Sequence, residues 1–244
     1  MKNILRKILL IICVCVFLYS SYQLVLIYLN YQAIENGTTE LIEEYVTEPE
    51  VEEVDPLERV IDFDALLERN EDVIGWIYIP DTKIDEPILK GENNDSYLRR
   101  DIDKKKLTAG QIFIDEINSK DFSDDNTIIY GHNMKNGSRF HDIKKFIKQD
   151  YFDEHKIIYI YLPDGTVNVY EAFSSKVINA VSDFYQKGID YQTYINNALK
   201  DADCTSEVSE EENPLILLST CYATGSDERN VVFARLKENV KIGE

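Results

Sequence analysis

The stretch "PLILLSTCYATGSDERNVVFARL" (residues 214–236) contains two apolar runs separated by a polar segment. The first run ends at Cys221, and the second begins directly after Arg229. Short runs of branched and aromatic residues, bounded by turn residues, are typical of β-strands. If the two strands pair as a hairpin with residues 222–228 as the loop, Cys221 and Arg229 lie at the same end of the sheet. We expect a functional site at that end.

Six further segments have the same strand character, and with 214–221 and 230–236 they make eight predicted strands. They are residues 75–80, 83–89, 110–115, 126–131, 156–162 and 166–178. Neither a β-α-β rhythm nor a glycine-rich phosphate loop accompanies them. The pattern predicts a mostly β fold, an antiparallel sheet or barrel with peripheral helices.

Helical patterns precede and interrupt these strands. Residues 57–67 predict one or two short helices, with Asp62 as a helix N-cap. A second helix is expected after Gly137, where apolar residues gather on one face, and a third at 191–199, where they follow the helical period. The apolar face of each helix predicts core packing.

The N-terminus has the pattern of a membrane anchor. Residues 8–29 are almost entirely apolar, about the length that crosses a bilayer as a helix. Lys2, Arg6 and Lys7 precede this segment, so the positive-inside rule predicts a cytoplasmic N-terminus. The alternative is a cleaved signal peptide, but the apolar segment is long and no A-x-A site follows. We therefore expect residues 1–30 to form an uncleaved single-pass anchor.

Two segments follow the anchor. Residues 31–56 are rich in Glu and Asp and contain no basic residue, which predicts an extended, self-repelling stalk outside the cell. Residues 57–244 are expected to form the folded domain. The formal net charge of −19 argues against a nucleic-acid partner, because phosphate binding needs a basic face. The basic run 104–106 is expected to be a solvated turn.

Four cysteines are present, of which Cys13 and Cys15 lie in the apolar segment. Outside it, Cys204 and Cys221 leave two alternatives open. They pair in a disulfide, or Cys221 is a free thiol at a strand end. We favour the free thiol, because two arbitrary cysteines rarely meet disulfide geometry.

A reactive thiol needs a nearby base or cation. Of the three histidines, His132 directly follows a predicted strand and enters a Gly/Asn-rich loop, so it is the candidate base. We expect His141 at the polar edge of its helix and His155 in solvent. Arg229 would stabilise an oxyanion; the alternative is an ion pair with a neighbouring carboxylate.

The motifs "LSTC" (218–221), Arg229 at the head of "NVVFARL", and "YGHNM" (130–134) together resemble the sortases, membrane-bound cysteine transpeptidases of Gram-positive bacteria. Their order along the chain matches as well. The segments 63–80 and 182–205 look like the helical entry and the insert of class B members. The resemblance implies an eight-stranded antiparallel or mixed β-barrel, with N-terminal helices and a helix-bearing insert before the Cys strand. Leu217 departs from it, standing where the family has threonine.

The resemblance also implies the roles of the residues. Cys221 would attack a threonine carbonyl in a C-terminal NPxT[N/G]-like sorting signal, His132 would move protons and Arg229 would hold the substrate. Thr220, Ser219 and Asn133 would support the substrate or the oxyanion. No metal or cofactor is implied. The partners would be surface proteins that carry the signal and a peptidoglycan amine.

Three rival functions remain at this stage. A cysteine hydrolase would use the same residues and pass the acyl group to water. A transpeptidase that cross-links glycan stems also uses Cys and His, but "LSTC" fits it poorly. A non-catalytic tethered binding domain would bury Cys221 as an inert thiol.

Overall fold

The computed structural model describes residues 2–49, 54–209, 211–221 and 225–242, with the backbone alone at Cys221. These residues form two compact units, one ending at Thr39 and the other beginning at Glu40. The first unit is a single helix, the larger part of α1 (Lys2–Tyr45). Its most apolar 18-residue window has a mean hydropathy of 2.3 and none of it is buried, so α1 is long and apolar enough to cross a membrane.

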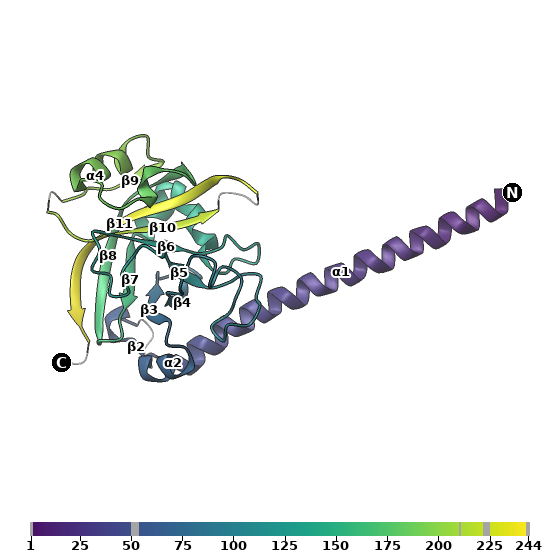
Figure 1. Ribbon diagram of the computed structural model, residues 1–244, viewed down its shortest axis with the longest axis horizontal. Helices are drawn as coiled ribbons and strands as arrows, with labels where there is room; N and C mark the ends of the chain where they lie inside the picture. Colours follow the sequence, from purple (N-terminus) through teal and green to yellow (C-terminus); the bar gives the residue numbers. More distant parts are fainter. Residues whose placement is uncertain (1, 50–53, 210, 222–224, 243–244) are drawn as a thin grey trace. The chain divides into compact units, whose positions relative to one another are not determined.

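The second unit is a β-barrel of eight strands, in the order β11, β10, β6, β5, β4, β3, β7, β8, and β8 pairs with β11 to close it (Figure 1). The strands are β3 (Val73–Tyr78), β4 (Asp85–Leu89), β5 (Ile112–Ile114), β6 (Asn126–Tyr130), β7 (Ile157–Tyr161), β8 (Thr166–Asn179), β10 (Leu215–Cys221) and β11 (Glu228–Lys241). Two neighbouring pairs, β10 with β6 and β4 with β5, run parallel. The mixed eight-stranded barrel and all eight predicted strands are confirmed.

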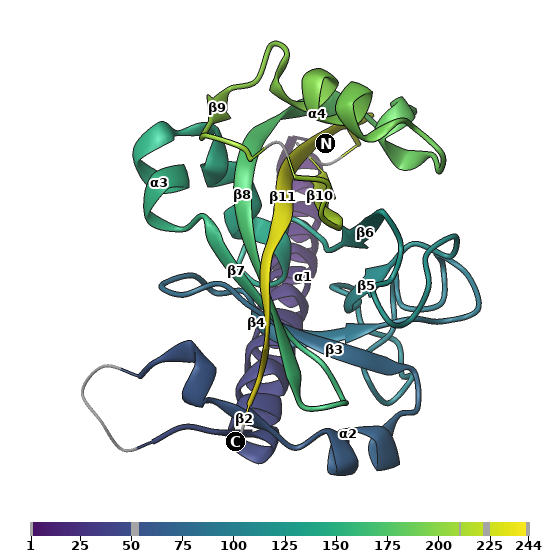
Figure 2. The same cartoon turned by 90° about the vertical axis from the view of Figure 1, so that its left-hand side faces the viewer.

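Two long strands, β8 and β11, run beside each other along the barrel (Figure 2). Side chains alternate along each strand, so each strand contributes to two cores. Leu218 and Val232 pack inside the barrel, whereas Leu217 and Phe233 pack on its outer face under the helical insert. Three two-residue strands, β1 (Val46–Thr47), β2 (Val60–Ile61) and β9 (Cys204–Thr205), were too short to predict from sequence.

The helices of the barrel unit are η1 (Pro56–Glu58), α2 (Phe63–Arg69), η2 (Phe140–Ile147), α3 (Gln149–Glu154), η3 (Asp183–Tyr185) and α4 (Tyr191–Leu199). Asp62 caps α2 as predicted, its Oδ1 accepting from the backbone N–H of Ala65 at 3.0 Å. The helix after Gly137 has 3-10 geometry. Its buried residues Phe140, Ile143 and Phe146 are spaced by three, which matches three residues per turn.

The extended stalk predicted for residues 31–56 is wrong as far as Tyr45, because α1 remains helical to that residue. The barrel unit also begins before the predicted boundary at 57. Leu41 and Tyr45 are 4% and 5% exposed in its second core cluster. Their burial offsets the repulsion among the glutamates, which the sequence alone does not reveal.

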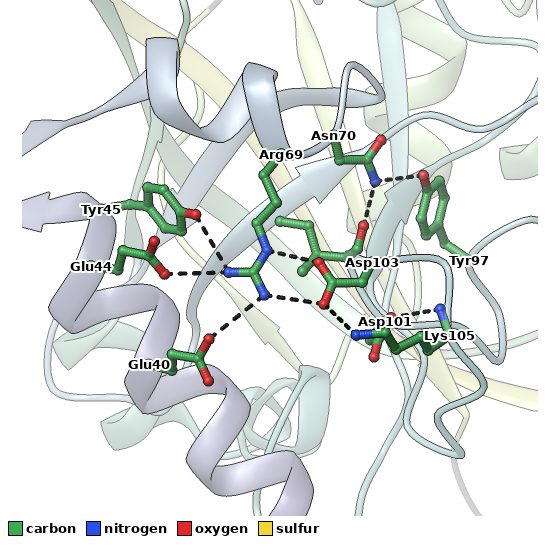
Figure 3. A network of polar contacts seen from close by, with 10 residues as sticks. Glu40, Glu44, Tyr45, Arg69, Asn70, Tyr97, Asp101, Asp103 and Lys105 are labelled. Carbon is green, nitrogen blue, oxygen red and sulfur yellow. Dashed lines mark hydrogen bonds and ion pairs between the residues drawn. The ribbon is translucent and has the colours of Figure 1, made fainter.

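Arg69 holds this helix end from the other side (Figure 3). Its guanidinium forms ion pairs with Glu40 and Glu44 of α1 and with Asp103, and it donates a hydrogen bond to the Tyr45 hydroxyl. The Arg69 guanidinium thus links the carboxylates of Glu40 and Glu44 to the carboxylate of Asp103. Residues 40–45 of the acidic segment are therefore part of the barrel unit.

Candidate active site

Three strand ends meet at one end of the barrel. In the parallel pair β6–β10, Tyr130 lies opposite Ser219, and in the antiparallel pair β10–β11, Cys221 lies opposite Arg229. His132 is two residues past Tyr130, and Cys221 is two residues past Ser219. The strand register therefore brings together the ends that carry Cys221, His132 and Arg229, as the hairpin prediction requires.

A cavity of about 220 Å³ opens at these strand ends. His132, Arg229 and Ser219 line it together with Asn94, Asp95, Leu98, Phe113, Tyr130 and Gly131. The side chain of Cys221 lies outside the described residues. Its strand neighbour on the register, Arg229, and the residue two positions before it, Ser219, both face the cavity.

His132 is half-buried and its ring has a defined partner. Nε2 lies 2.8 Å from the Leu98 carbonyl oxygen. A carbonyl only accepts, so Nε2 carries the proton and, in the neutral ring, Nδ1 keeps its lone pair. Burial lowers the pKa of His132, the hydrogen bond to Leu98 opposes this, and the charges of Arg99 and Arg139 add to the lowering. The ring is therefore held in one tautomer and favours its neutral form.

Arg229 does not form the ion pair that was its alternative role. Within the described part of the chain, its Nη1 donates to the carbonyl oxygens of Ser226 at 2.9 Å and Glu228 at 3.0 Å, and no carboxylate contacts it. These hydrogen bonds hold the guanidinium against the backbone at the start of β11. Its positive charge remains uncompensated beside the cavity, where it can attract a carbonyl oxygen or an anion.

Side chains that do not line the cavity themselves, Tyr185 and Asp115, hold two of its lining residues, Ser219 and Tyr130. The Tyr185 hydroxyl lies 2.8 Å from Ser219 Oγ, and the Tyr185 ring stacks on Tyr130 with centroids 6.1 Å apart. Tyr130 in turn donates to Asp115 Oδ2 at 2.8 Å. Burial, followed by the charge of Asp115, raises the pKa of Tyr130, so its hydroxyl stays protonated. Tyr185 and Asp115 belong to none of the motifs singled out in the sequence, because separate segments of the chain supply them.

Two of the predicted supporting residues lie away from the cavity. Thr220 is 2% exposed, and its buried Oγ1 has no hydrogen-bond partner among the residues that the structure describes. It pairs in register with Asn230, whose side-chain amide is also unpartnered. Asn133 is half-buried and forms a β-bridge with Arg139. Of the three supporting candidates, only Ser219 has its side chain in the cavity.

The other two histidines are accounted for elsewhere. His141 is half-buried at the polar edge of η2, where its Nδ1 lies 3.5 Å from Lys144 Nζ. The prediction that His155 is solvated is wrong. It is 9% exposed, its ring stacks on Tyr151 with centroids 3.9 Å apart, and its Nδ1 donates to the Tyr151 carbonyl. The flanking charges suggested exposure, but the helix end turns this ring inward.

Cys204 is a free, buried thiol in β9, so the alternative of a disulfide with Cys221 is not realised. Burial raises its pKa, which disfavours the reactive thiolate. Among the described residues, no group of three or more His, Cys, Asp or Glu side chains is placed to hold a metal ion.

Comparison with known proteins agrees with this arrangement. A family model for the sortase domain matches residues 77–237. Sortase B of Listeria monocytogenes is 37% identical over 163 residues, which cover 64% of this chain and 65% of that protein. The chain thus matches just under two thirds of that relative's length.

Solved structures have the same fold. Sortase B from Bacillus anthracis in complex with AAEK1 is 27% identical, with a TM-score of 0.69, over 86% of this chain and 98% of that one. The Staphylococcus aureus sortase B–substrate complex is 25% identical, with a TM-score of 0.69, over 88% and 97% of the two chains. The family model matches most of the chain, and the similar proteins are named sortase B. The chain therefore belongs to the sortase family.

Proposed function

We propose that this protein is a membrane-anchored cysteine transpeptidase that cleaves a sorting signal after threonine and transfers the acyl group to a cell-wall amine. One observation supports the proposal: His132 and Arg229 line one cavity, and Arg229 lies opposite the backbone of Cys221 in the β10–β11 register. Nucleophile, base and cation are the three groups that acyl transfer requires.

In the first half-reaction, the Cys221 thiol gives its proton to Nδ1 of His132, and the resulting thiolate attacks the threonine carbonyl carbon. A carbon–sulfur bond forms and the carbonyl oxygen becomes an oxyanion beside the Arg229 guanidinium. Collapse of this intermediate breaks the carbon–nitrogen bond. The leaving amine takes a proton from His132, and a thioester remains on Cys221.

In the second half-reaction, an amine attacks the thioester and gives its proton to His132. Because the Nε2–H of His132 donates a hydrogen bond to the Leu98 carbonyl, Nδ1 is the nitrogen that exchanges this proton. The carbon–sulfur bond then breaks, the new amide leaves, and the Cys221 thiolate takes the proton back from His132, which regenerates the thiol. A hydrolase differs only in accepting water, so preference for an amine separates the two functions.

The acceptor amine belongs to peptidoglycan or its precursor in this proposal, and the donor is a surface protein with an NPxT[N/G]-like signal. The cavity supports a donor of this kind, because apolar Phe113 and Leu98 lie beside polar Asn94 and Ser219. Such a lining suits a short peptide with an apolar and an amide-bearing side chain.

The anchor follows from the same chemistry. Residues 8–29 of α1 would span the membrane with the N-terminus in the cytoplasm, which keeps the barrel unit outside, where substrate and acceptor meet. Cell fractionation checks this: the full chain should sediment with membranes, and an alkaline wash should not release it. Release by the wash would contradict the anchor.

The test of function uses the full chain in detergent and a panel of x-P-x-T-x peptides. Intact-mass spectrometry should detect an acyl adduct that maps to Cys221 and disappears when an amine is added, with formation of ligated peptide. Cys221→Ala should abolish the adduct, and Cys204→Ala should not.

Two results would overturn the proposal. An adduct that water discharges as fast with amine as without it would indicate a hydrolase. A Cys221 thiol that forms no adduct and resists a soluble alkylating reagent would indicate a binding domain.

A further inference from the structure

A buried ion pair lies beneath the loop that carries His132. Glu86 in β4 is fully buried and Arg139 is 2% exposed, and the carboxylate contacts the guanidinium directly. The backbone N–H of Arg139 also donates to Glu86 at 3.3 Å. Burying two charges removes their hydration, so such a pair contributes little net stability by itself. The role of the ion pair therefore lies in the backbone segments that it contacts.

Arg139 closes the loop that begins at His132. A β-bridge joins Arg139 to Asn133, and the backbone N–H of Phe140 donates to the His132 carbonyl at 3.0 Å. Arg139 has a φ of 57°, a left-handed conformation that a non-glycine residue adopts only where its surroundings enforce it. The contacts with Glu86 are those surroundings.

The same guanidinium binds a second segment. Its Nε donates to the Gly110 carbonyl at 2.9 Å. Gly110 has a φ of 55°, and a Cβ there would lie 2.4 Å and 2.5 Å from the carbonyl oxygens of Tyr97 and Leu98. Only glycine allows this close approach. The Leu98 carbonyl is the group that accepts the His132 hydrogen bond.

These contacts connect Arg139 both to the loop that carries the His132 ring and to the segment that accepts its hydrogen bond. Arg139 fixes the backbone that carries the His132 ring, and through Gly110 it fixes the backbone that binds the ring. The Glu86 carboxylate neutralises the charge of the Arg139 guanidinium, which allows the guanidinium to stay buried at this end of the barrel. We propose that Glu86 and Arg139 are positioning residues that set the place of the His132 imidazole, an inference that rests on the proposed function for its catalytic consequence.

The decisive variant is the double replacement Glu86→Leu with Arg139→Met. It removes one negative and one positive charge, so the net charge is unchanged, and apolar residues of similar size often preserve stability at a buried pair. It deletes the bond to Gly110. The expected result is a fall in kcat of about 10- to 100-fold with little change in KM, because small displacements of a catalytic group have this effect.

A second variant, Arg139→Lys, keeps the charge but loses the Nε–H donor and the planar fork. It should lower kcat by about 10-fold. The matched control is the neighbouring pair of buried Arg59 with half-buried Asp85, in which Arg59 Nη2 lies 2.8 Å from Asp85 Oδ2. Asp85 is adjacent to Glu86 on β4, yet Arg59→Met with Asp85→Asn leaves the His132 loop untouched and should leave kcat unchanged.

A measurement without substrate separates this inference from the proposed function. With histidine ¹³C-labelled in the full chain, the three imidazole signals can be assigned with His141→Gln and His155→Gln and then titrated by NMR. The pKa of His132 lies below its ordinary value of 6.5 because the ring is buried. Both Arg139 variants should shift it, because they change the burial of the ring and its hydrogen bond to Leu98, and the control should leave it unchanged.

Unchanged His132 titration in both variants would overturn the positioning role, whatever the activity. If the His132 titration shifts in the variants but the protein forms no acyl adduct with any peptide, the positioning role is upheld and the proposed transpeptidase function is contradicted. A drop in kcat that also appears in the Arg59–Asp85 control would overturn the inference as well, since any buried pair would then suffice.

Discussion

At the scale of single residues, the proposed chemistry depends on three side chains, each of which is weak evidence when taken alone. A cysteine at a strand end is usually a small buried hydrophobe, and an arginine at a strand start usually pairs with a carboxylate. Arg229 instead binds two backbone carbonyls and faces a cavity shared with His132. Their combination at one barrel end is what indicates acyl transfer.

Replacing His132 by Ala should lower kcat/KM by about 10²- to 10⁴-fold, because it removes the imidazole that lines the cavity and is the proposed acid and base. Peptide cleavage followed by chromatography measures this. His141→Ala should retain activity. His155→Ala should lower the free energy of unfolding, since its ring stacks on Tyr151, but it should keep kcat/KM. A comparable activity loss in either control would point to a different base.

Arg229→Lys should lower kcat/KM by about 10²-fold, because a point charge cannot hold two carbonyls and an oxyanion with one planar fork. The same peptide assay measures it, with Arg235→Lys on the same strand as the matched control. If Arg229→Lys is as active as the parent protein, the guanidinium is only a structural cap for the loop before β11.

At the scale of elements, Arg69 couples α2 to the end of α1 and to the loop that contains Asp103 (Figure 3). The hydrogen bond from Arg69 is the main cause that lowers the pKa of Asp103 to about 2, from 3.8. A carboxylate with a depressed pKa stabilises the fold above its unfolded pKa and loses this contribution as the pH falls through the folded value.

Arg69→Met should therefore destabilise the protein by a constant amount above about pH 4 and by less as the pH falls from 3.8 toward 2. Urea unfolding of the full chain in detergent across this range measures the difference. Asp103→Asn should show the same pH dependence. A parent and a variant whose difference does not shrink in acid would mean that the Asp103 pair contributes nothing to folding.

At the scale of the whole molecule, the boundary between the two compact units lies at Glu40 and not at residue 57. Leu41 and Tyr45 are buried against the barrel unit, and β1 pairs with β2. The last turns of α1 therefore belong to the folded unit, and the part of the chain available as a spacer is shorter than the acidic composition suggests.

A chain that begins at Glu40 should unfold with the full stability of the barrel unit, whereas one that begins at Leu57 should lose about 3 kcal/mol or more. The loss corresponds to exposing two large side chains at about 1.5–3 kcal/mol each. Denaturant unfolding of the two truncated chains measures it. Equal stabilities would show that residues 40–56 do not contribute to the fold.

The sequence alone determined the eight barrel strands, the apolar N-terminal segment and the three residues of the proposed mechanism, but not the short elements β1, β2, β9, η3 and α3. Strand and helix patterns are local properties, as Asp62 and the eight strand segments illustrate, and a strand end followed by a polar loop is readable without a structure. The 3-10 geometry of η2 was not predicted, although the three-residue spacing of Phe140, Ile143 and Phe146 was present in the sequence.

Only the tertiary structure decided which groups surround those residues. The Leu98 carbonyl, Tyr185, and the Glu86–Arg139 pair reach the site from segments far apart along the chain, and no pattern within one segment encodes such contacts. The helical stalk end and the buried His155 were missed for the same reason. Burial depends on which surfaces meet, so charge and periodicity in one segment cannot predict it when a distant segment supplies the partner.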